Sequence, residues 1–254
     1  MLNLSFTAWS GLIDQLWWPL VRILGLMSVA PVLGHRALPV RIKLALGMLV
    51  ALTVAPVLPA HPPVAIDSLP GFVLAAQEAT IGLALGFAVR IVFAAVETAG
   101  ELVGLQMGLS FAGYFDPGGS GGGNVISSWL STTAALLFLS INGHLLLIAG
   151  VVESFYAMPI ASPIASLQPM RIVMLGAELF RIALSLSLPF VALLLLVNLS
   201  MGVVSRVAPQ INIFAVGFPV TMIVGLTALA TILPYLEGPL VHAMERSIAV
   251  MLTR

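Results

Sequence analysis

Long runs of apolar residues, separated by short polar or proline-rich segments, dominate the hydropathy pattern of this chain. Each run is long enough for a helix to cross a bilayer, and none shows the alternation that is typical of half-buried strands. The pattern therefore predicts an all-α integral membrane protein with about six long apolar helices. We expect these helices at residues 16–33, 44–60, 69–96, 125–151, 172–204 and 211–236.

The third apolar run continues to residue 112 and carries glycines and ionisable residues at helical spacing. In a helix these residues fall within an arc of roughly 100°, and charge on one face of an apolar helix usually packs on protein or water rather than lipid. One helix over 78–112 would be roughly 50 Å long, against about 30 Å for a bilayer core. We therefore expect either a break or a segment outside an ordinary span. The arc comprises Gly82, Gly86, Arg90, Glu97, Gly100, Glu101, Gly104 and Gly108.

The glycines of this arc recur with a four-residue step, which lets two helix backbones approach closely. Two interpretations stay open, namely packing within the chain and a seam for another subunit. Arg90, Glu97 and Glu101 lie within about 40° of one another on a helix. Because Glu97 and Glu101 repel each other at this spacing, we expect the charges to reach an interface or to pair with cations of a partner.

Two further segments have a helical charge pattern. Glu178 and Arg181 lie three residues apart, which predicts an ion pair within one helix, and Pro189 predicts a kink in the same helix. The last segment, from about Pro239, is predicted to be a short amphipathic helix that suits an interface or a partner. Its apolar side holds Val241, Met244, Ile248 and Met251, and its polar side holds His242, Glu245 and Arg246.

Composition and charge narrow the class of protein. Of the 254 residues, 60% are hydrophobic and 8% are charged, whereas a soluble domain carries about 25% charge. Ten basic and ten acidic residues balance, and no basic tail is present, so nucleic acid is not an expected partner. The densest positive cluster, Arg36, Arg41 and Lys43, predicts a cytoplasmic loop and an N-terminus on the opposite side.

The sequence offers no pattern for catalysis. Cysteine is absent, residues 118–123 lack the Gly-Lys-Ser/Thr of a nucleotide loop, and residues 108–112 lack the second glycine of a nucleophile elbow. The histidines are far apart and none belongs to a ligand motif, so we expect no metal site. We therefore predict no enzyme activity, no cofactor, and no catalytic or metal-binding residue. The histidines are His35, His61, His144 and His242.

The segment from Arg206 to Pro219 is predicted to be a tight helical hairpin. Pro209 stops the first helix, and Arg206 can bond the last carbonyl groups of that helix. Gln210 and Asn212 can cap the turn.

In the Arg206–Pro219 segment the chain resembles the FliR family, whose members are the flagellar counterparts of the SctT export proteins of type III secretion. The resemblance runs over nearly the whole length, and the Arg206–Pro219 string is its most specific part. The other matching residues are Arg22 with Gly25, Ala30–Gly34, Leu38–Arg41, Glu97, Gly100, Gly104–Gly108, Asp116–Pro117 and Asn142–His144.

The resemblance implies a fold and a function. It implies one export-gate membrane domain over 1–254, built of kinked helical hairpins, with a FliP-like part at about 1–170 and a FliQ-like part at 171–254. Such a protein would be a multi-pass inner-membrane subunit of the flagellar basal body. With FliP-like and FliQ-like chains it would form the type III secretion channel for unfolded flagellar subunits. FlhA-like and FlhB-like export components and membrane lipid would be further partners.

The resemblance also implies that the loop at about 113–124 projects into the pore and helps to close it. Aromatic residues give this loop bulk before the glycine run, and the glycines can move aside without strain. An ordinary disordered connection is the alternative. The candidate plug residues are Phe111, Tyr114, Phe115, Asp116, Pro117, Gly118, Gly119, Gly121, Gly122, Gly123 and Asn124.

A small-solute secondary transporter is the alternative function. It would show inverted repeats and broken helices at matching positions of two halves. We find no such symmetry in this sequence.

Overall fold

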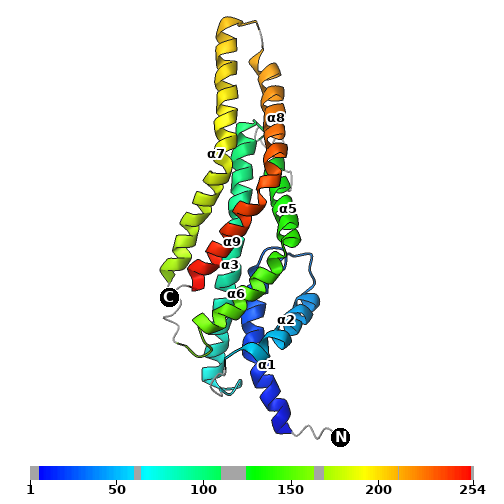
Figure 1. The fold of residues 1–254 in the computed structure, drawn as a ribbon, viewed down its shortest axis with the longest axis vertical. Helices are drawn as coiled ribbons and strands as arrows, with labels where there is room; N and C mark the ends of the chain where they lie inside the picture. The colour runs from blue at the N-terminus through cyan, green and yellow to red at the C-terminus, as the bar shows by residue number, and fades with distance from the viewer. Residues whose placement is uncertain (1–5, 60–63, 110–123, 163–168, 211, 253–254) are drawn as a thin grey trace. The chain divides into compact units, whose positions relative to one another are not determined.

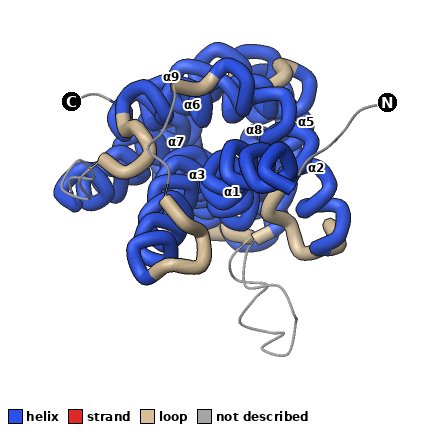
Figure 2. The backbone as a smooth tube through the Cα atoms, turned by 90° about the horizontal axis from the view of Figure 1, so that it is seen from below, coloured by secondary structure: helices blue, strands red, loops and turns tan. Residues whose placement is uncertain are grey.

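The computed structural model describes residues 6–59, 64–109, 124–162, 169–210 and 212–252, and within these ranges the regular structure is helical throughout (Figure 2). Figure 1 shows the helices in chain order. The α-helices are α1 (Phe6–Val29), α2 (Val40–Val54), α3 (Leu69–Gln106), α5 (Val125–Ser140), α6 (Gly143–Ala157), α7 (Pro169–Val207), α8 (Ile213–Ile232) and α9 (Glu237–Leu252), with short 3-10 turns η1 (Ala55–Val57) and η3 (Leu233–Tyr235).

The predicted all-α membrane fold is confirmed, with a lower helix count than the predicted six. Among the described residues, four helical segments are long and apolar enough to cross a membrane, and a bent pair raises this number to five if it counts as one span. The four segments are Val40–Val57, Leu69–Gln106, Ile172–Val207 and Ala215–Tyr235.

The apolar run at 125–151 does not form the single helix that its hydropathy predicts. It contains α5 and the start of α6, which are bent by 70° at the break between them. The break contains Asn142, whose φ is +56°. Asparagine adopts this left-handed conformation more readily than other non-glycine residues, and the glycine that follows favours a turn. The turn at Asn142-Gly143 therefore interrupts an otherwise continuous apolar run.

Helix α3 is continuous over 38 residues, which corresponds to about 57 Å. It ends at Gln106 and not at residue 112, so Gly108 does not lie on the predicted helical arc. Gly108 has a φ of +80°, while Leu109 N–H donates to Gly104 O and Gly108 N–H donates to Leu105 O. This pair of bonds is the Schellman pattern, which ends a helix at a glycine.

The chain divides into two compact units that are not contiguous in sequence. Unit 1 contains Met1–Ile91, Asn142–Gly176 and Met244–Arg254, and unit 2 contains Val92–Ile141 and Ala177–Ala243. Helices α3, α7 and α9 each contribute residues to both units. The division into a FliP-like part and a FliQ-like part stays a prediction.

In unit 1, α1 packs closely on the first half of α3 through glycines. A Cβ added to Gly25 would lie 2.6 Å from Ala79 O, and one added to Gly86 would lie 2.6 Å from Leu26 O. A Cβ on Gly82 would collide with the carbonyl group of Arg22. Because backbone atoms cannot move aside cheaply, only glycine fits at these crossing points.

In unit 2, the second half of α3 packs on the start of α5. A Cβ on Gly100 would lie 2.6 Å from Ser127 Cα, and one on Gly104 would collide with Asn124. Asn124 caps α5, because its Oδ1 accepts from Ser127 N–H at 2.9 Å. The same side chain donates from Nδ2 to Glu101 O at 3.2 Å. The cap of α5 is thus also a contact with α3.

The turn between α7 and α8 follows the hairpin prediction in most respects. Helix α7 ends at Val207, two residues before Pro209, and α8 begins directly after Asn212. Asn212 Oδ1 accepts from Ala215 N–H at 3.3 Å, as an N-cap does. Within the described residues, Arg206 makes no hydrogen bond to the last carbonyl groups of α7, and its side chain is exposed.

The predicted amphipathic C-terminal helix is α9. Met244, Ile248 and Met251 are buried in unit 1. The side chains on the predicted polar side, His242, Glu245 and Arg246, are exposed.

Candidate functional site

A buried ion pair lies in unit 1. Arg22 of α1 donates from Nε to Glu78 Oε2 of α3 at 2.7 Å, and neither side chain is exposed. An isolated charge in such a place would cost several kcal/mol, but a paired and hydrogen-bonded charge is tolerated. The pair therefore fixes α1 against α3.

The remaining donors of Arg22 reach α6 and the residue that follows it. Nη1 donates to Ser154 Oγ at 3.0 Å, and Nη2 donates to Met158 O at 3.0 Å. The guanidinium carbon lies 3.9 Å from the ring centroid of Phe155, which is a cation–π geometry. Arg22 thus joins three helices, and its burial gives it a positioning role rather than a ligand-binding one.

Sequence reasoning missed this cluster. Arg22 was noted only in the family pattern, and Glu78 was not selected at all. A signal was available, because Glu78 is the one carboxylate of the 69–96 run and Arg22 is the one ionisable residue of the 16–33 run. A carboxylate and an arginine on two apolar helices are expected to pair when neither has an opposite charge within reach on its own helix, since neither can remain unpaired away from water.

The charges selected from the sequence lie elsewhere on α3. Arg90, Glu97 and Glu101 are exposed. Among the residues that the structure describes, no ion pair involves any of them. Their side chains are therefore accessible from outside this chain.

Most glycines of the predicted arc contact this chain itself. Gly82 and Gly86 meet α1, whereas Gly100 and Gly104 meet α5 and its cap. Gly108 lies beside Phe218 of α8, whose ring would be 3.3 Å from an added Cβ. Of the predicted arc, the three charged side chains are thus the part that remains exposed.

The Glu178–Arg181 pair forms as its spacing predicts. Arg181 Nη2 lies 3.2 Å from Glu178 Oε1 on α7. Arg181 is largely exposed, so the pair contributes little stability. At the far end of α7, Arg206, Gln210 and Asn212 are exposed around the turn to α8.

The candidate plug lies almost entirely outside the described residues. This applies to Phe111, Tyr114, Phe115, Asp116, Pro117, Gly118, Gly119, Gly121, Gly122 and Gly123. Asn124 is described, and it caps α5.

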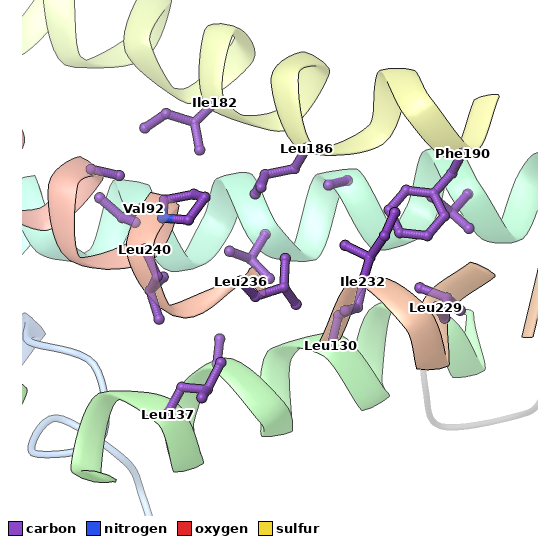
Figure 3. Close-up of a pocket in the computed structure, with 16 residues that line it drawn as sticks. Val92, Leu130, Leu137, Ile182, Leu186, Phe190, Leu229, Ile232, Leu236 and Leu240 are labelled. Carbon is purple, nitrogen blue, oxygen red and sulfur yellow. The ribbon is translucent and has the colours of Figure 1, made fainter. Parts of the chain in front are cut away.

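The cavities of the two units are apolar. Figure 3 shows Val92 of α3 and leucine, isoleucine and phenylalanine side chains of α5, α7 and α8 converging on a cavity in unit 2, whose volume is about 30 Å³. A cavity of about 130 Å³ in unit 1 is lined by apolar residues and His144. Over the described ranges, no group of three or more His, Cys, Asp or Glu could hold a metal ion.

Large apolar side chains are exposed on several helices. They lie on α2, on α7 and on α8, and they include Val40, Leu49, Phe180, Leu199 and Ile223. Apolar surface of this extent faces lipid or other proteins. Together with the long apolar helices, it defines an all-helical membrane protein.

Comparisons with known proteins identify its family. Residues 13–247 match the sequence profile of the bacterial export proteins, family 1. The flagellar biosynthetic protein FliR of Pectobacterium carotovorum subsp. carotovorum is 45% identical over 234 residues, which cover 91% of this chain and 89% of that protein. FliR of Escherichia coli K12 is 42% identical over 235 residues, with coverage of 92% and 90%. FliR of Bacillus subtilis 168 is 32% identical, covering 80% of each.

The chain therefore belongs to the FliR family, whose members are flagellar biosynthetic proteins of the bacterial export class. The predicted family resemblance is confirmed.

Proposed function

We propose that this protein is a subunit of the inner-membrane export gate of the flagellar type III secretion apparatus. With FliP-like and FliQ-like chains it forms the channel through which unfolded flagellar subunits leave the cell. The observation that carries the proposal is the exposed pair Glu97 and Glu101 on an uninterrupted, over-long apolar helix.

Helix α3 is too long for an ordinary span. Its length of about 57 Å exceeds a bilayer core of about 30 Å. Carboxylates on a mainly apolar helix are costly against acyl chains, and no described cation of this chain pairs with Glu97 or Glu101. Cationic side chains of unlike subunits would satisfy both, which supports a place inside a protein assembly.

The exposed apolar faces of α7 and α8 support the same proposal. These helices carry large apolar side chains at the surface, including Phe180, Leu184 and Leu188. If the segment from 171 onward is the FliQ-like part that the family resemblance implies, these apolar faces would pack against FliQ-like subunits. The export components FlhA-like and FlhB-like would join the gate in the basal body, and the energy for export would come from outside this chain.

The loop at about 113–124 is proposed as the pore plug, which rests on the family resemblance and on its aromatic and glycine composition. This role is separate from the assembly role of α3 and has its own test, given below.

Co-purification tests the assembly role. A tagged chain with Glu97→Leu and Glu101→Leu is co-expressed with FliP-like and FliQ-like chains. We expect less of both partners to co-purify with it, because cationic side chains of the partners lose two carboxylate counter-ions. The matched control is Glu153→Leu with Glu237→Leu, which removes two exposed carboxylates from other helices. Equal recovery from the two variants would refute the role of Glu97 and Glu101.

The same purification, followed by native mass measurement, separates the proposal from a secondary transporter. A gate subunit elutes with unlike partners in unequal numbers. Elution alone or as a small homo-oligomer would favour the transporter.

A further inference from the structure

The turn between α1 and α2 carries a basic cluster, which we define as Arg36, Arg41 and Lys43. The two arginines are exposed and the lysine is half-buried. Within the described part of the chain, none of the three takes part in an ion pair. Residues 15–66 contain no Asp or Glu, so the segment that carries the basic cluster supplies no neutralising carboxylate.

Hydrogen bonds hold the basic cluster in a compact turn. Leu38 N–H donates to His35 O at 3.2 Å, which places Arg36 inside a tight turn. Lys43 Nζ donates to Gly34 O at 3.0 Å, so the lysine folds back over that turn. The backbone of the turn and the side chain of Lys43 are therefore held in place.

The basic cluster stands at the N-terminus of α2. The N-cap is Pro39, and no side chain hydrogen-bonds the first N–H groups of the helix. The positive end of the helix dipole adds to the charge of Arg36 and Arg41. Positive potential at this end of α2 thus comes from the two arginines and from the helix dipole.

The surface that follows the basic cluster along α2 is apolar. Gly47, Ala51 and Val54 are buried, and Gly47 meets Leu24 of α1. Most other residues of α2 are exposed and apolar, and the segment Val40–Val57 is long and apolar enough to cross a membrane. The exposed large ones are Val40, Ile42, Leu44, Leu46, Met48, Leu49 and Leu52.

We propose that the basic cluster binds the headgroup of an anionic phospholipid, with Arg36 and Arg41 donating to the phosphate group. Guanidinium groups match phosphate oxygens in charge and in planar geometry. The acyl chains of the same lipid would cover the exposed face of α2. In a phospholipid the anionic phosphate group is joined to long apolar chains. In the protein the basic cluster is followed along the chain by the exposed apolar side chains of α2, so both parts of the lipid have a matching surface. This inference does not depend on the export role.

A site-specific fluorescence experiment tests the proposal, because the chain contains no cysteine. Ala45 is exposed on α2, four residues after Arg41 and thus about 6 Å further along the axis. A fluorophore attached through Ala45→Cys in the full chain is quenched by phospholipids with brominated acyl chains. In nanodiscs we compare brominated phosphatidylglycerol with brominated phosphatidylcholine.

The expected result is stronger quenching by phosphatidylglycerol at equal lipid fractions. Arg36→Gln with Arg41→Gln should lower this preference about 30-fold, since each basic group near an anionic surface contributes roughly fivefold. Arg36→Lys with Arg41→Lys should keep most of it. The matched control, Arg90→Gln with Arg206→Gln, removes two exposed arginines elsewhere and should leave it unchanged.

Three results would overturn the proposal. The first is equal quenching by phosphatidylglycerol and phosphatidylcholine in the unchanged chain. The second is the same preference for phosphatidylglycerol in Arg36→Gln with Arg41→Gln as in the matched control. The third is an absence of quenching by either lipid in the co-purified export complex, since that result would mean that protein covers the basic cluster.

Discussion

Breaking the Arg22–Glu78 pair should be one of the most destabilising single changes in this protein. In Glu78→Leu the guanidinium of Arg22 keeps its contacts to Ser154 and Met158 but loses the carboxylate 2.7 Å away. Because neither side chain is exposed, water cannot replace the lost partner. Removing one member of a fully buried pair costs about 3–5 kcal/mol of unfolding free energy.

Replacing both members should cost less than replacing one. In Arg22→Met with Glu78→Leu no charge remains buried, so we expect at least half of the lost stability to return. Ser154→Ala removes one hydrogen bond to the charged group and should cost about 1.5–3 kcal/mol. Glu153→Leu, an exposed neighbour on the same helix, is the control and should change stability by less than about 0.5 kcal/mol.

The assay is reversible unfolding of the purified chain in mixed micelles with increasing denaturing detergent, followed by tryptophan fluorescence. The unchanged chain, Arg22→Met, Glu78→Leu and the double variant form a double-mutant cycle, and Ser154→Ala and the control are measured beside it. A single-variant cost below about 1 kcal/mol, or a double variant as unstable as the sum of the two single ones, would refute the reasoning that the buried pair is energetically coupled.

Three further outcomes follow from the close contacts and the loop. Gly82→Ala should destabilise unit 1 by about 2 kcal/mol or more, because the added Cβ meets the carbonyl group of Arg22. Gly202→Ala, whose added Cβ meets nothing within 4 Å, should stabilise α7 by up to about 1 kcal/mol. Thermal unfolding compares the two variants, and equal effects would contradict the packing argument. Asn124→Ala should cost about 1 kcal/mol through the lost cap, and Asn124→Asp, which keeps the capping oxygen, should cost less in the same measurement. Deleting Gly118–Gly123 should leave assembly intact but make the closed channel leaky to small ions, and unchanged ion permeability of the cells would count against a plug.

Local signals predicted much of the fold. The end of α7 before Pro209, the cap by Asn212 and the buried side of α9 each depend on residues a few positions apart. Such features follow from backbone sterics and helical periodicity, which a single sequence carries in full. The Glu178–Arg181 pair is predictable for the same reason.

Features that depend on the conformation of a single residue or on distant residues were missed or wrong. The hydropathy of 125–151 hides the bend at Asn142, because a single left-handed residue changes direction without changing the apolar average. Glu78 and Arg22 lie 56 residues apart, and only the packing of α1 on α3 brings them together. Gly108 matched the glycine step but ends the helix instead, since the αL conformation of one residue overrides periodicity.

The sequence separation of 56 residues from Arg22 to Glu78 also has a consequence for biosynthesis. At about 5–20 residues per second, the ribosome delivers the carboxylate about 3–11 s after the guanidinium. During that interval the arginine of α1 lacks its counter-ion, and a lone arginine at the centre of a bilayer would cost about 2.5–3.5 kcal/mol. We therefore expect α1 to reach its final packing only after α3 has been synthesised and Glu78 can pair with Arg22.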